Sequence, residues 1–381
     1  MHPRPEYHFT PPQNWMNDPN GLIFDEGRYH LYYQHNPSGN EFGNISWGHA
    51  TSLDLISWEH ASVALKATDK IMIFSGCVVK NEKGRLCAIY TEHEGDSENY
   101  RERICLAESG DRGFTFDQST RKVILEHEDP DFRDPKVFWH AQSAAWIMCV
   151  ALPKRYTIQF YRSGNLLDWT LSGEFSNDRC QGQFWECPEI FCLTNENEAD
   201  VWILSISGEN ADGVSWGMFY FAGQFDGYGF KAELDARPID IGSDFYAGIT
   251  FEGTVERVMI GWCGNWAYAN RQATLGWKGM LSTPRKLHFR KGQLIQELIS
   301  ERAPETLTVE TAAKEILIQS GLLRWSNELV QIDRSTSPLY FPEELQQVSY
   351  HGPVRSLNLY VDVGIVECVI NNGEQVMTVR I

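Results

Sequence analysis

The feature that most constrains the fold of this sequence is an apolar strand pattern that repeats along the chain. The pattern occurs five times, at intervals of about 55 to 60 residues, in segments 30–33, 85–90, 145–150, 201–204 and 257–260. A fixed period of this length is typical of architectures in which each unit packs against its neighbours. The sequence therefore predicts a fold built from five similar units.

A tight turn that leads into an aromatic strand follows four of the five segments, at residues 52–58, 109–114, 163–169 and 224–230. Gly, Asn and Asp interrupt the first 290 residues or so at short intervals, which favours short strands over amphipathic helices. Radial repetition of such units predicts an all-β fold, a five-bladed β-propeller over residues 1–300. A β-sandwich with coincidental spacing is the alternative.

The repeat stops near residue 300, and the polar stretch 302–311 has the composition of a linker. Period-two alternation then runs through 357–363, 366–370 and 376–381, with Asn371-Asn372-Gly373 between the last two segments. Residues 301–381 are predicted to form a small β domain that ends in a hairpin.

Composition limits the classes of partner. The formal charge of −18 offers no footprint for a phosphate backbone, so nucleic acid and anionic membranes are not expected partners. The longest apolar run, 144–152, is far shorter than the roughly 18 residues of a membrane span.

The nine cysteines include no C-x-x-C pair, and several lie in apolar strand patterns. We interpret them as reduced core thiols of a cytoplasmic protein. The lack of an apolar signal sequence before the first motif also favours a cytoplasmic location. No metal-binding spacing occurs, so no metal and no cofactor are expected.

Three short motifs each place one carboxylate beside a proline or an aromatic residue. They are Trp15-Met16-Asn17-Asp18-Pro19-Asn20-Gly21, Phe132-Arg133-Asp134-Pro135-Lys136 and Trp185-Glu186-Cys187-Pro188. Each motif lies about 12 to 16 residues before an apolar segment, and Ser75 and Asp244 hold similar places in the other two units. If these positions lie on the innermost strands, their side chains converge on the axis of the propeller.

Two carboxylates that flank a glycosidic bond are the working groups of a glycoside hydrolase. Glu186 suits the acid/base, because burial against Trp185 and a neighbouring aspartate would raise its pKa. Asp18, in a rigid turn sequence, suits the nucleophile. Asp134 would stay ionised beside Arg133 and stabilise the transition state. Taken singly, each motif has a structural reading as a turn, a surface ion pair or a core edge.

The motifs together resemble glycoside hydrolase family 32, which contains invertases, levanases and inulinases. The resemblance covers essentially the whole chain and continues in the family's order. It includes Tyr33-Gln34-His35-Asn36-Pro37, Trp47-Gly48-His49-Ala50, Phe74-Ser75-Gly76, Asp244-Phe245-Tyr246-Ala247, Gly261-Trp262, Asn265-Trp266 and Pro284-Arg285-Lys286-Leu287.

The resemblance implies a five-bladed propeller followed by a β-sandwich, and a retaining mechanism through a covalent fructosyl-enzyme. It implies that Asp18 is the nucleophile, Glu186 the acid/base and Asp134 the transition-state stabiliser. The implied fructose-binding residues are Asn17, Gln34, Trp47, Phe74, Ser75 and Arg133, with Trp266 as a further member.

This sequence departs from the family pattern in three respects. Phe42 stands in the pocket wall where many members have a tryptophan, which removes an indole donor. Cys77 and Gly264 replace a serine and a larger residue, and we expect small effects from both. The C-terminal domain is abbreviated, so a shortened sandwich is expected.

We therefore predict a cytoplasmic β-fructofuranosidase that binds a small carbohydrate, either sucrose, its 6-phosphate or a short fructo-oligosaccharide. The alternatives are a fructosyltransferase with the same intermediate, a non-catalytic carbohydrate-binding propeller and a protein-interaction propeller. The sequence leaves the oligomeric state open, and a homo-oligomer is possible.

Overall fold

Seven sheets account for the regular structure in a computed structural model that describes residues 4–96, 98–177, 184–209, 216–272 and 276–381. The helical segments in these ranges are 3-10 turns of three residues each, so the all-β prediction is confirmed. The turns are η1 (Gln118–Thr120), η2 (Ala141–Ser143), η3 (Pro153–Arg155), η4 (Ala269–Arg271), η5 (Glu343–Leu345) and η6 (Asn371–Gly373). No helix in the described ranges is long and apolar enough to cross a membrane.

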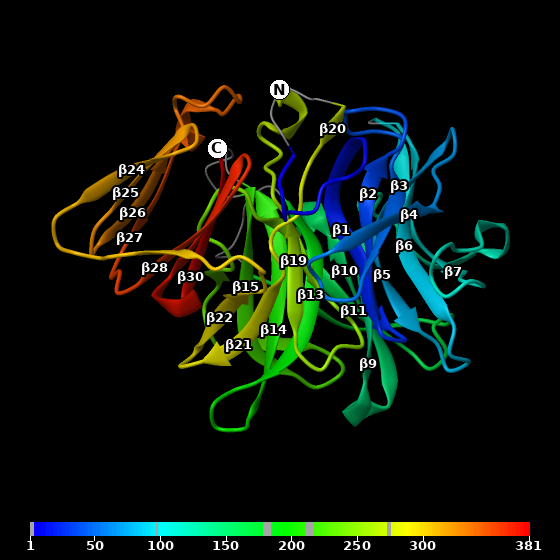
Figure 1. Ribbon diagram of the computed structural model, residues 1–381. Helices are drawn as coiled ribbons and strands as arrows, with labels where there is room; N and C mark the ends of the chain where they lie inside the picture. Colours follow the sequence, from blue (N-terminus) through cyan, green and yellow to red (C-terminus); the bar gives the residue numbers. More distant parts are fainter. Residues whose placement is uncertain (1–3, 97, 178–183, 210–215, 273–275) are drawn as a thin grey trace.

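Five sheets occupy the chain up to Leu298, and in each of them successive strands pair in chain order (Figure 1). The first contains β1 (Asn14–Asp25), β2 (Arg28–Asn36), β3 (Ser46–Ser52) and β4 (Trp58–Leu65), with β20 (Trp277–Lys278) added beside β1. The second contains β5 (Ile71–Lys80), β6 (Leu86–Gly95), β7 (Tyr100–Glu108) and β8 (Lys122–Glu126).

The third sheet contains β9 (Arg133–His140), β10 (Ala145–Leu152), β11 (Thr157–Ser163) and β12 (Thr170–Ser176). The fourth contains β13 (Trp185–Thr194), β14 (Asp200–Glu209), β15 (Trp216–Phe225) and β16 (Phe230–Ala232), and β17 (Arg237–Pro238) also pairs with β15. The fifth contains β18 (Tyr246–Thr250), β19 (Val258–Trp262), β21 (Arg285–Arg290) and β22 (Gln293–Leu298). The five apolar segments of the sequence repeat fall on β2, β6, β10, β14 and β19, the second strand of each unit.

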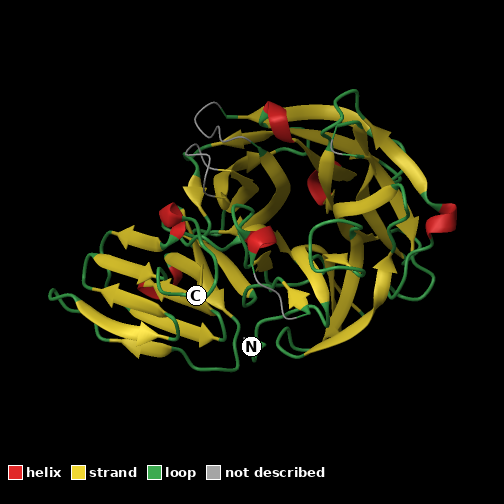
Figure 2. Cartoon of the chain, turned by 90° about the horizontal axis from the view of Figure 1, so that it is seen from above, coloured by secondary structure: helices red, strands yellow, loops and turns green. Residues whose placement is uncertain are grey.

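The first strands of the five sheets contact one another in a closed ring, β1 to β5, β9, β13, β18 and back to β1. Figure 2 shows the sheets set around a common centre. Each neighbouring pair of sheets shares an apolar cluster, such as Ile89 with Met148 between the second and third sheets. Tyr246 with Met16 closes the ring between the fifth and the first.

The repeated turns join the third and fourth strands of a sheet, or directly follow the third strand. In the first sheet, the Ser52 hydroxyl accepts the Leu55 amide at 2.9 Å, and the Asp54 carboxylate accepts the Ser57 amide at 2.7 Å. Short polar side chains satisfy backbone donors in such turns, which explains why Ser, Asp and Asn recur there.

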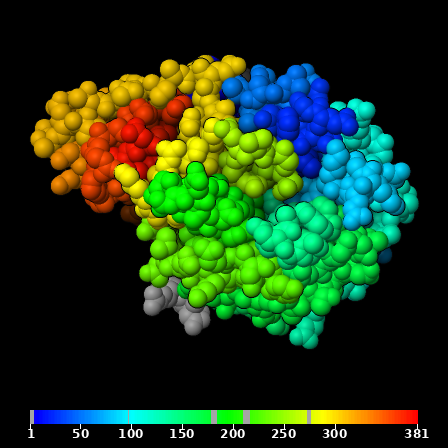
Figure 3. All heavy atoms as spheres, turned by 90° about the horizontal axis from the view of Figure 1, so that it is seen from below, coloured from blue at the N-terminus to red at the C-terminus, as the bar shows by residue number. Residues whose placement is uncertain are grey.

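The remaining two sheets lie beside the ring, as a lobe that is orange and red in Figure 3. One contains β23 (Glu305–Leu307), β28 (Leu357–Asp362), β29 (Ile365–Ile370) and β30 (Gln375–Arg380). The other contains β24 (Lys314–Ile318), β25 (Gly321–Trp325), β26 (Leu329–Asp333) and β27 (Gln347–His351). Their facing side chains, including Leu323 and Met377, form one apolar cluster.

The expected linker 302–311 is wrong in one detail, because it contains β23, which pairs with β28. The predicted terminal hairpin is present as β29 and β30.

Candidate active site

A register shift interrupts the first strand of each of the five ring sheets at the same relative place. The shifts lie at Asn17-Asp18 in β1, Ser75 in β5, Asp134-Pro135 in β9, Cys187-Pro188 in β13 and Ala247-Gly248 in β18. A β-bulge re-aims a side chain out of the normal alternation of a strand. The bulges therefore explain why side chains from separate units meet at one end of the ring.

The prediction that Asp244 lies on the innermost strand of the fifth unit is wrong. Asp244 lies two residues before β18 begins, is fully buried, and accepts a hydrogen bond from Arg334 of the C-terminal lobe at 2.8 Å. The position equivalent to Asp134 and Cys187 is Ala247, since these three residues share positive φ angles of 62°, 48° and 50°.

One pocket of about 250 Å³ opens over the bulges. Every predicted site residue except Trp47 lines it, namely Asn17, Asp18, Gln34, Phe42, Phe74, Ser75, Arg133, Asp134, Glu186 and Trp266. Trp47 is fully buried behind the wall, where its indole nitrogen donates to the Phe74 carbonyl at 3.0 Å. Trp47 thus supports the pocket wall from behind.

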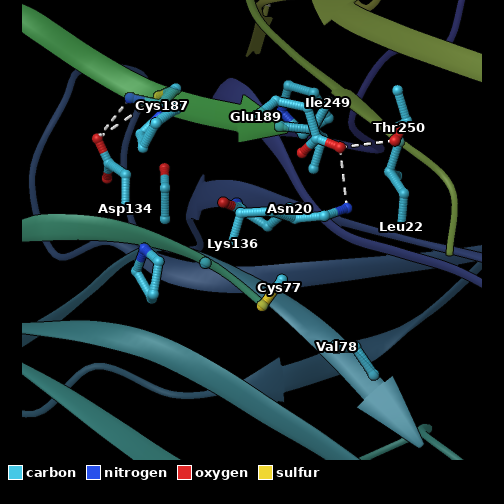
Figure 4. Close-up of a pocket in the computed structure, with 15 residues that line it drawn as sticks. Asn20, Leu22, Cys77, Val78, Asp134, Lys136, Cys187, Glu189, Ile249 and Thr250 are labelled. Atoms are coloured by element: carbon cyan, nitrogen blue, oxygen red, sulfur yellow. Dashed lines mark hydrogen bonds and ion pairs between the residues drawn. The ribbon is translucent and has the colours of Figure 1, made fainter. Parts of the chain in front are cut away.

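Cys187 joins the two aspartates at the floor of the pocket. Its backbone amide donates to Asp134 Oδ2 at 2.9 Å, a contact drawn in Figure 4. Its Sγ lies 3.7 Å from Asp18 Oδ2 and 3.6 Å from Asp134 Oδ2. Ser75 Oγ donates to Asp18 Oδ2 at 3.3 Å. Two carboxylates from β1 and β9 are therefore held on either side of one residue of β13.

Burial raises the pKa of Asp18 to about 7, and the Glu186 charge raises it too, against hydrogen bonds from Asn17 and Ser75 that lower it. Burial likewise raises the pKa of Asp134 to about 7, although the Arg133 charge lowers it. The sequence prediction for Asp134 considered the Arg133 pair, whereas burial outweighs the Arg133 charge in setting its pKa. The Nε atom of Arg133 lies 3.9 Å from Asp134 Oδ2, and the same guanidinium also contacts other carboxylates.

Glu186 lies in a polar setting. Arg133 Nη2 donates to its Oε1 at 2.7 Å, and the Tyr246 hydroxyl donates to its Oε2 at 2.5 Å. Trp185, expected to bury this carboxyl, instead packs on Phe175 and Phe221, because neighbouring residues of a strand face opposite sides. Both oxygens of the candidate acid/base therefore have fixed hydrogen-bond donors.

Four further residues line the pocket and were missed by the sequence analysis: His93, Tyr100, Glu102 and Asp131. Glu102 Oε2 accepts from Arg133 Nη1 at 3.2 Å, and Asp131 Oδ1 contacts the same nitrogen at 3.2 Å. No signal in the sequence marks the contacts of Glu102 and Asp131 with Arg133, because they depend on how β7 and the segment before β9 pack against each other.

Aromatic rings form two parts of the pocket wall. His93 stacks between Phe74 and Tyr100, with ring centroids 4.6 and 5.0 Å away. Phe42, which is 38% exposed, meets Trp266 edge to face at 5.5 Å. Apolar ring faces of this kind suit the C–H faces of a sugar, while the tryptophan donor common at position 42 is missing.

A buried ion pair lies below the floor, beside a cavity of about 20 Å³ (Figure 4). Lys136 Nζ is 2.9 Å from Glu189 Oε1, which also accepts from the Thr250 hydroxyl at 2.6 Å. Lys136 pairs with Glu189 and is not among the residues that line the larger pocket above.

The two other departures from the family pattern have clear local partners. Cys77 Sγ accepts the Val137 amide at 3.2 Å, as a serine oxygen could. A Cβ on Gly264 would come within 2.2 Å of the Trp262 ring, so glycine allows that ring to lie against the chain.

The family model described as "Glycosyl hydrolases family 32 N-terminal domain" matches residues 8–297. A levanase of Bacillus subtilis is 38% identical over 84% of this chain, which spans 51% of the levanase, about half its length. A sucrose-6-phosphate hydrolase of Escherichia coli is 31% identical over 99% of this chain and 89% of its own. Among solved structures, a fructofuranosidase from Schwanniomyces occidentalis complexed with fructose is 27% identical, covering 100% of this chain and 92% of that chain, with a TM-score of 0.88.

Proposed function

The chain belongs to glycoside hydrolase family 32, and on this premise we propose that it is a retaining β-fructofuranosidase acting on sucrose or short fructo-oligosaccharides. The observation that carries the proposal is the contact of Cys187 with both Asp18 and Asp134, combined with the link from Arg133 to Glu186. Carboxylates from three different sheets thereby face one sugar-sized pocket.

In the first step, Asp18 attacks the anomeric carbon of the fructosyl unit and forms an ester. The bond to the leaving-group oxygen breaks, and Glu186 gives that oxygen a proton. In the second step, Glu186 takes a proton from water, the oxygen of that water attacks the same carbon, and Asp18 departs as a carboxylate. Two inversions at one carbon give net retention.

Asp134 and Arg133 are proposed to hold the fructosyl hydroxyls while positive charge develops on the ring. The pocket also places Asn17, Gln34 and Ser75 around the same space, where amide and hydroxyl groups can hydrogen-bond a sugar. A mechanism of proton transfer and ester formation uses no cofactor. The absence of a cofactor remains a prediction from the sequence.

We propose that the five ring sheets are the blades of a propeller formed by residues 1–300, and that residues 301–381 form the shortened sandwich. Shared apolar clusters between neighbouring sheets and the separate cluster of the C-terminal lobe support this division.

The cytoplasmic location is also a proposal. All eight cysteines in the described ranges are free thiols, and all of them except Cys192 are buried, as suits a reducing compartment. The ninth, Cys180, lies outside the described residues. Cell fractionation tests the location, and size-exclusion chromatography with light scattering tests for the possible homo-oligomer.

A fructosyltransferase would form the same ester and resolve it on a second sugar. The test is a time course of the purified protein on sucrose and 1-kestose, with glucose, fructose and longer products quantified. Equal early release of glucose and fructose supports hydrolysis, whereas excess glucose with longer oligosaccharides supports transfer.

The Asp18→Asn variant is the control, since its amide keeps the shape of the side chain but is a poor nucleophile. We expect at least about a thousandfold loss of kcat. Sugar binding by the unmodified protein without any turnover would instead support the non-catalytic alternative.

A further inference from the structure

Asp131 gathers three hydrogen-bond donors at the edge of the pocket. Its carboxylate accepts the Tyr100 hydroxyl at 2.7 Å, contacts Lys154 Nζ at 2.7 Å and contacts Arg133 Nη1 at 3.2 Å. The Asp131 side chain is itself 6% exposed. A single buried carboxylate therefore engages two cations and the hydroxyl of the aromatic wall.

Arg133, Lys154 and Arg155 are all paired with carboxylates. Among the described lining residues, Arg133 is the one lysine or arginine, and it also contacts Glu102 and Glu186. Lys154 is half exposed, but its amine is held by Asp131 and Tyr100. Arg155, the next basic residue, pairs with Asp129 at 2.7 Å.

The lining is strongly acidic, with Asp18, Glu102, Asp131, Asp134 and Glu186 facing one space. A phosphate group needs free cationic donors to replace its hydration. Like charges brought together without such donors oppose binding. Tyr100 and Asp131 line the same pocket as the three acids, so a leaving group that extends from the fructosyl unit along this wall meets both residues.

We infer that Asp131 is a specificity-determining residue, which engages Lys154 and Arg133 and so makes the site select an uncharged leaving group over a phosphorylated one. The inference rests on the proposed function and names its substrate class: sucrose and neutral oligosaccharides are substrates, and sucrose 6-phosphate is disfavoured. The 6-phosphate would meet Asp131 and its bound cations instead of free donors.

The test compares kcat/KM for sucrose and for sucrose 6-phosphate. Both release the same fructosyl unit, so damage to the fructosyl site cancels in the ratio. We expect the unmodified protein to favour sucrose by about a hundredfold. Asp131→Asn removes the negative charge that pairs with Lys154, so it should shift the ratio toward the phosphate ester by about tenfold, and adding Lys154→Met should abolish the shift.

The matched control is Asp129→Asn. In the unmodified protein Asp129 pairs with Arg155 and accepts the Asp131 backbone N–H at 3.1 Å. The variant weakens the Arg155 pair but keeps an amide oxygen that can accept the same N–H. It should leave the ratio unchanged, and thermal unfolding of every variant checks the fold. Equal activity on both sugars, or an unchanged ratio in a folded Asp131→Asn variant, overturns the inference but leaves the proposed function standing. Absence of hydrolysis of either sugar refutes the proposed function itself.

Discussion

The three catalytic candidates differ in how their charges are stabilised. Asp18 and Asp134 are buried beside Cys187, whose thiol is a weak donor, and both have a pKa of about 7. Glu186 instead receives strong hydrogen bonds from Arg133 and Tyr246. The proposed nucleophile requires the carboxylate form of Asp18, which a pKa of about 7 leaves populated at neutral pH and above.

The raised pKa values predict a stability effect. Asp18 and Asp134 have ordinary pKa values of 3.8 and folded values of about 7, so the folded state holds these protons more tightly than the unfolded state. Their contribution to stability is then full below about pH 4 and is lost as pH rises through about 7. The loss is at most about 4 kcal/mol for each carboxyl.

Replacing Asp18 with Asn should raise the melting temperature relative to the unmodified protein, and more so at pH 8 than at pH 4. Thermal unfolding at the two pH values measures this, with the exposed Asp168→Asn as control. An equal effect of Asp18→Asn at both pH values would contradict the claim that burial of the ionised Asp18 carboxylate destabilises the folded state.

Tyr246 is predicted to position Glu186 for proton transfer. Tyr246→Phe removes one hydrogen bond to the Glu186 carboxyl and should lower kcat by roughly tenfold, with a smaller change in KM. Steady-state kinetics on sucrose test this. A change confined to KM would instead assign Tyr246 to substrate binding.

The three acids could be found from sequence because each stands in a compact local motif. Glu102 and Asp131 could not, since their contacts with Arg133 depend on how β7 and the segment before β9 pack against each other. Trp47 shows that a motif can also mark a residue outside the pocket. This residue was predicted to bind the sugar, but it supports the pocket wall from behind.

At the scale of single strands, the bulges of the ring carry the site. All five inner strands break their ladders at a bulge, and in four of them the bulge holds a residue that lines the pocket. Three of the five bulges use positive φ at a residue other than glycine. Such backbone is held only where the surrounding structure determines it. The strand repeat was predictable from apolar spacing, whereas the bulges that aim the side chains were not.

The bulge in β5 has a specific requirement for glycine. A Cβ on Gly76 would lie 2.2 Å from the Ile89 carbonyl oxygen, a backbone atom that cannot move without breaking the ladder. Gly76→Ala should therefore lower the melting temperature and reduce kcat/KM through displacement of Ser75. Gly110→Ala is the matched control, because nothing lies within 4 Å of its added Cβ.

If Gly76→Ala unfolds at the same temperature as the Gly110→Ala control, the tight packing of this bulge is refuted. Circular dichroism melts and sucrose kinetics on the two variants give this comparison.

At the scale of the whole molecule, buried charges join the C-terminal lobe to the ring. His8 contacts Asp362 and Glu367 at 3.0 Å each, Arg285 reaches Glu367 at 2.8 Å, and Arg334 reaches Asp244. The sequence analysis separated the two parts by composition and period. The links could not be predicted from the sequence, because they join residues 82 to 359 positions apart. The strands β24 to β27 were missed for lack of a clear alternation.

His8 should make the joint between the parts sensitive to pH. Burial lowers the pKa of His8, but the hydrogen bonds that its ring donates to Asp362 and Glu367, together with their charges, outweigh burial, so the pKa is raised above 6.5. Its stabilisation is complete below pH 6.5 and is lost as pH rises through the higher folded value.

His8→Gln should therefore destabilise the protein by about 3 kcal/mol at pH 5.5, because the buried Asp362 loses its cation and Glu367 keeps Arg285 alone. The loss should be clearly smaller at pH 9.5. Urea unfolding at both pH values tests this, and an equal loss would show that His8 acts as a neutral group.

The central claim is that Asp18 forms a covalent fructosyl ester beside Glu186. The most direct measurement uses Glu186→Gln with a fructosyl substrate whose leaving group needs no proton, so that the ester forms but its hydrolysis lacks a base. Peptide mass spectrometry should locate the fructosyl group on Asp18. Turnover with the label on another residue, or formation of a product with inverted configuration, would contradict the account.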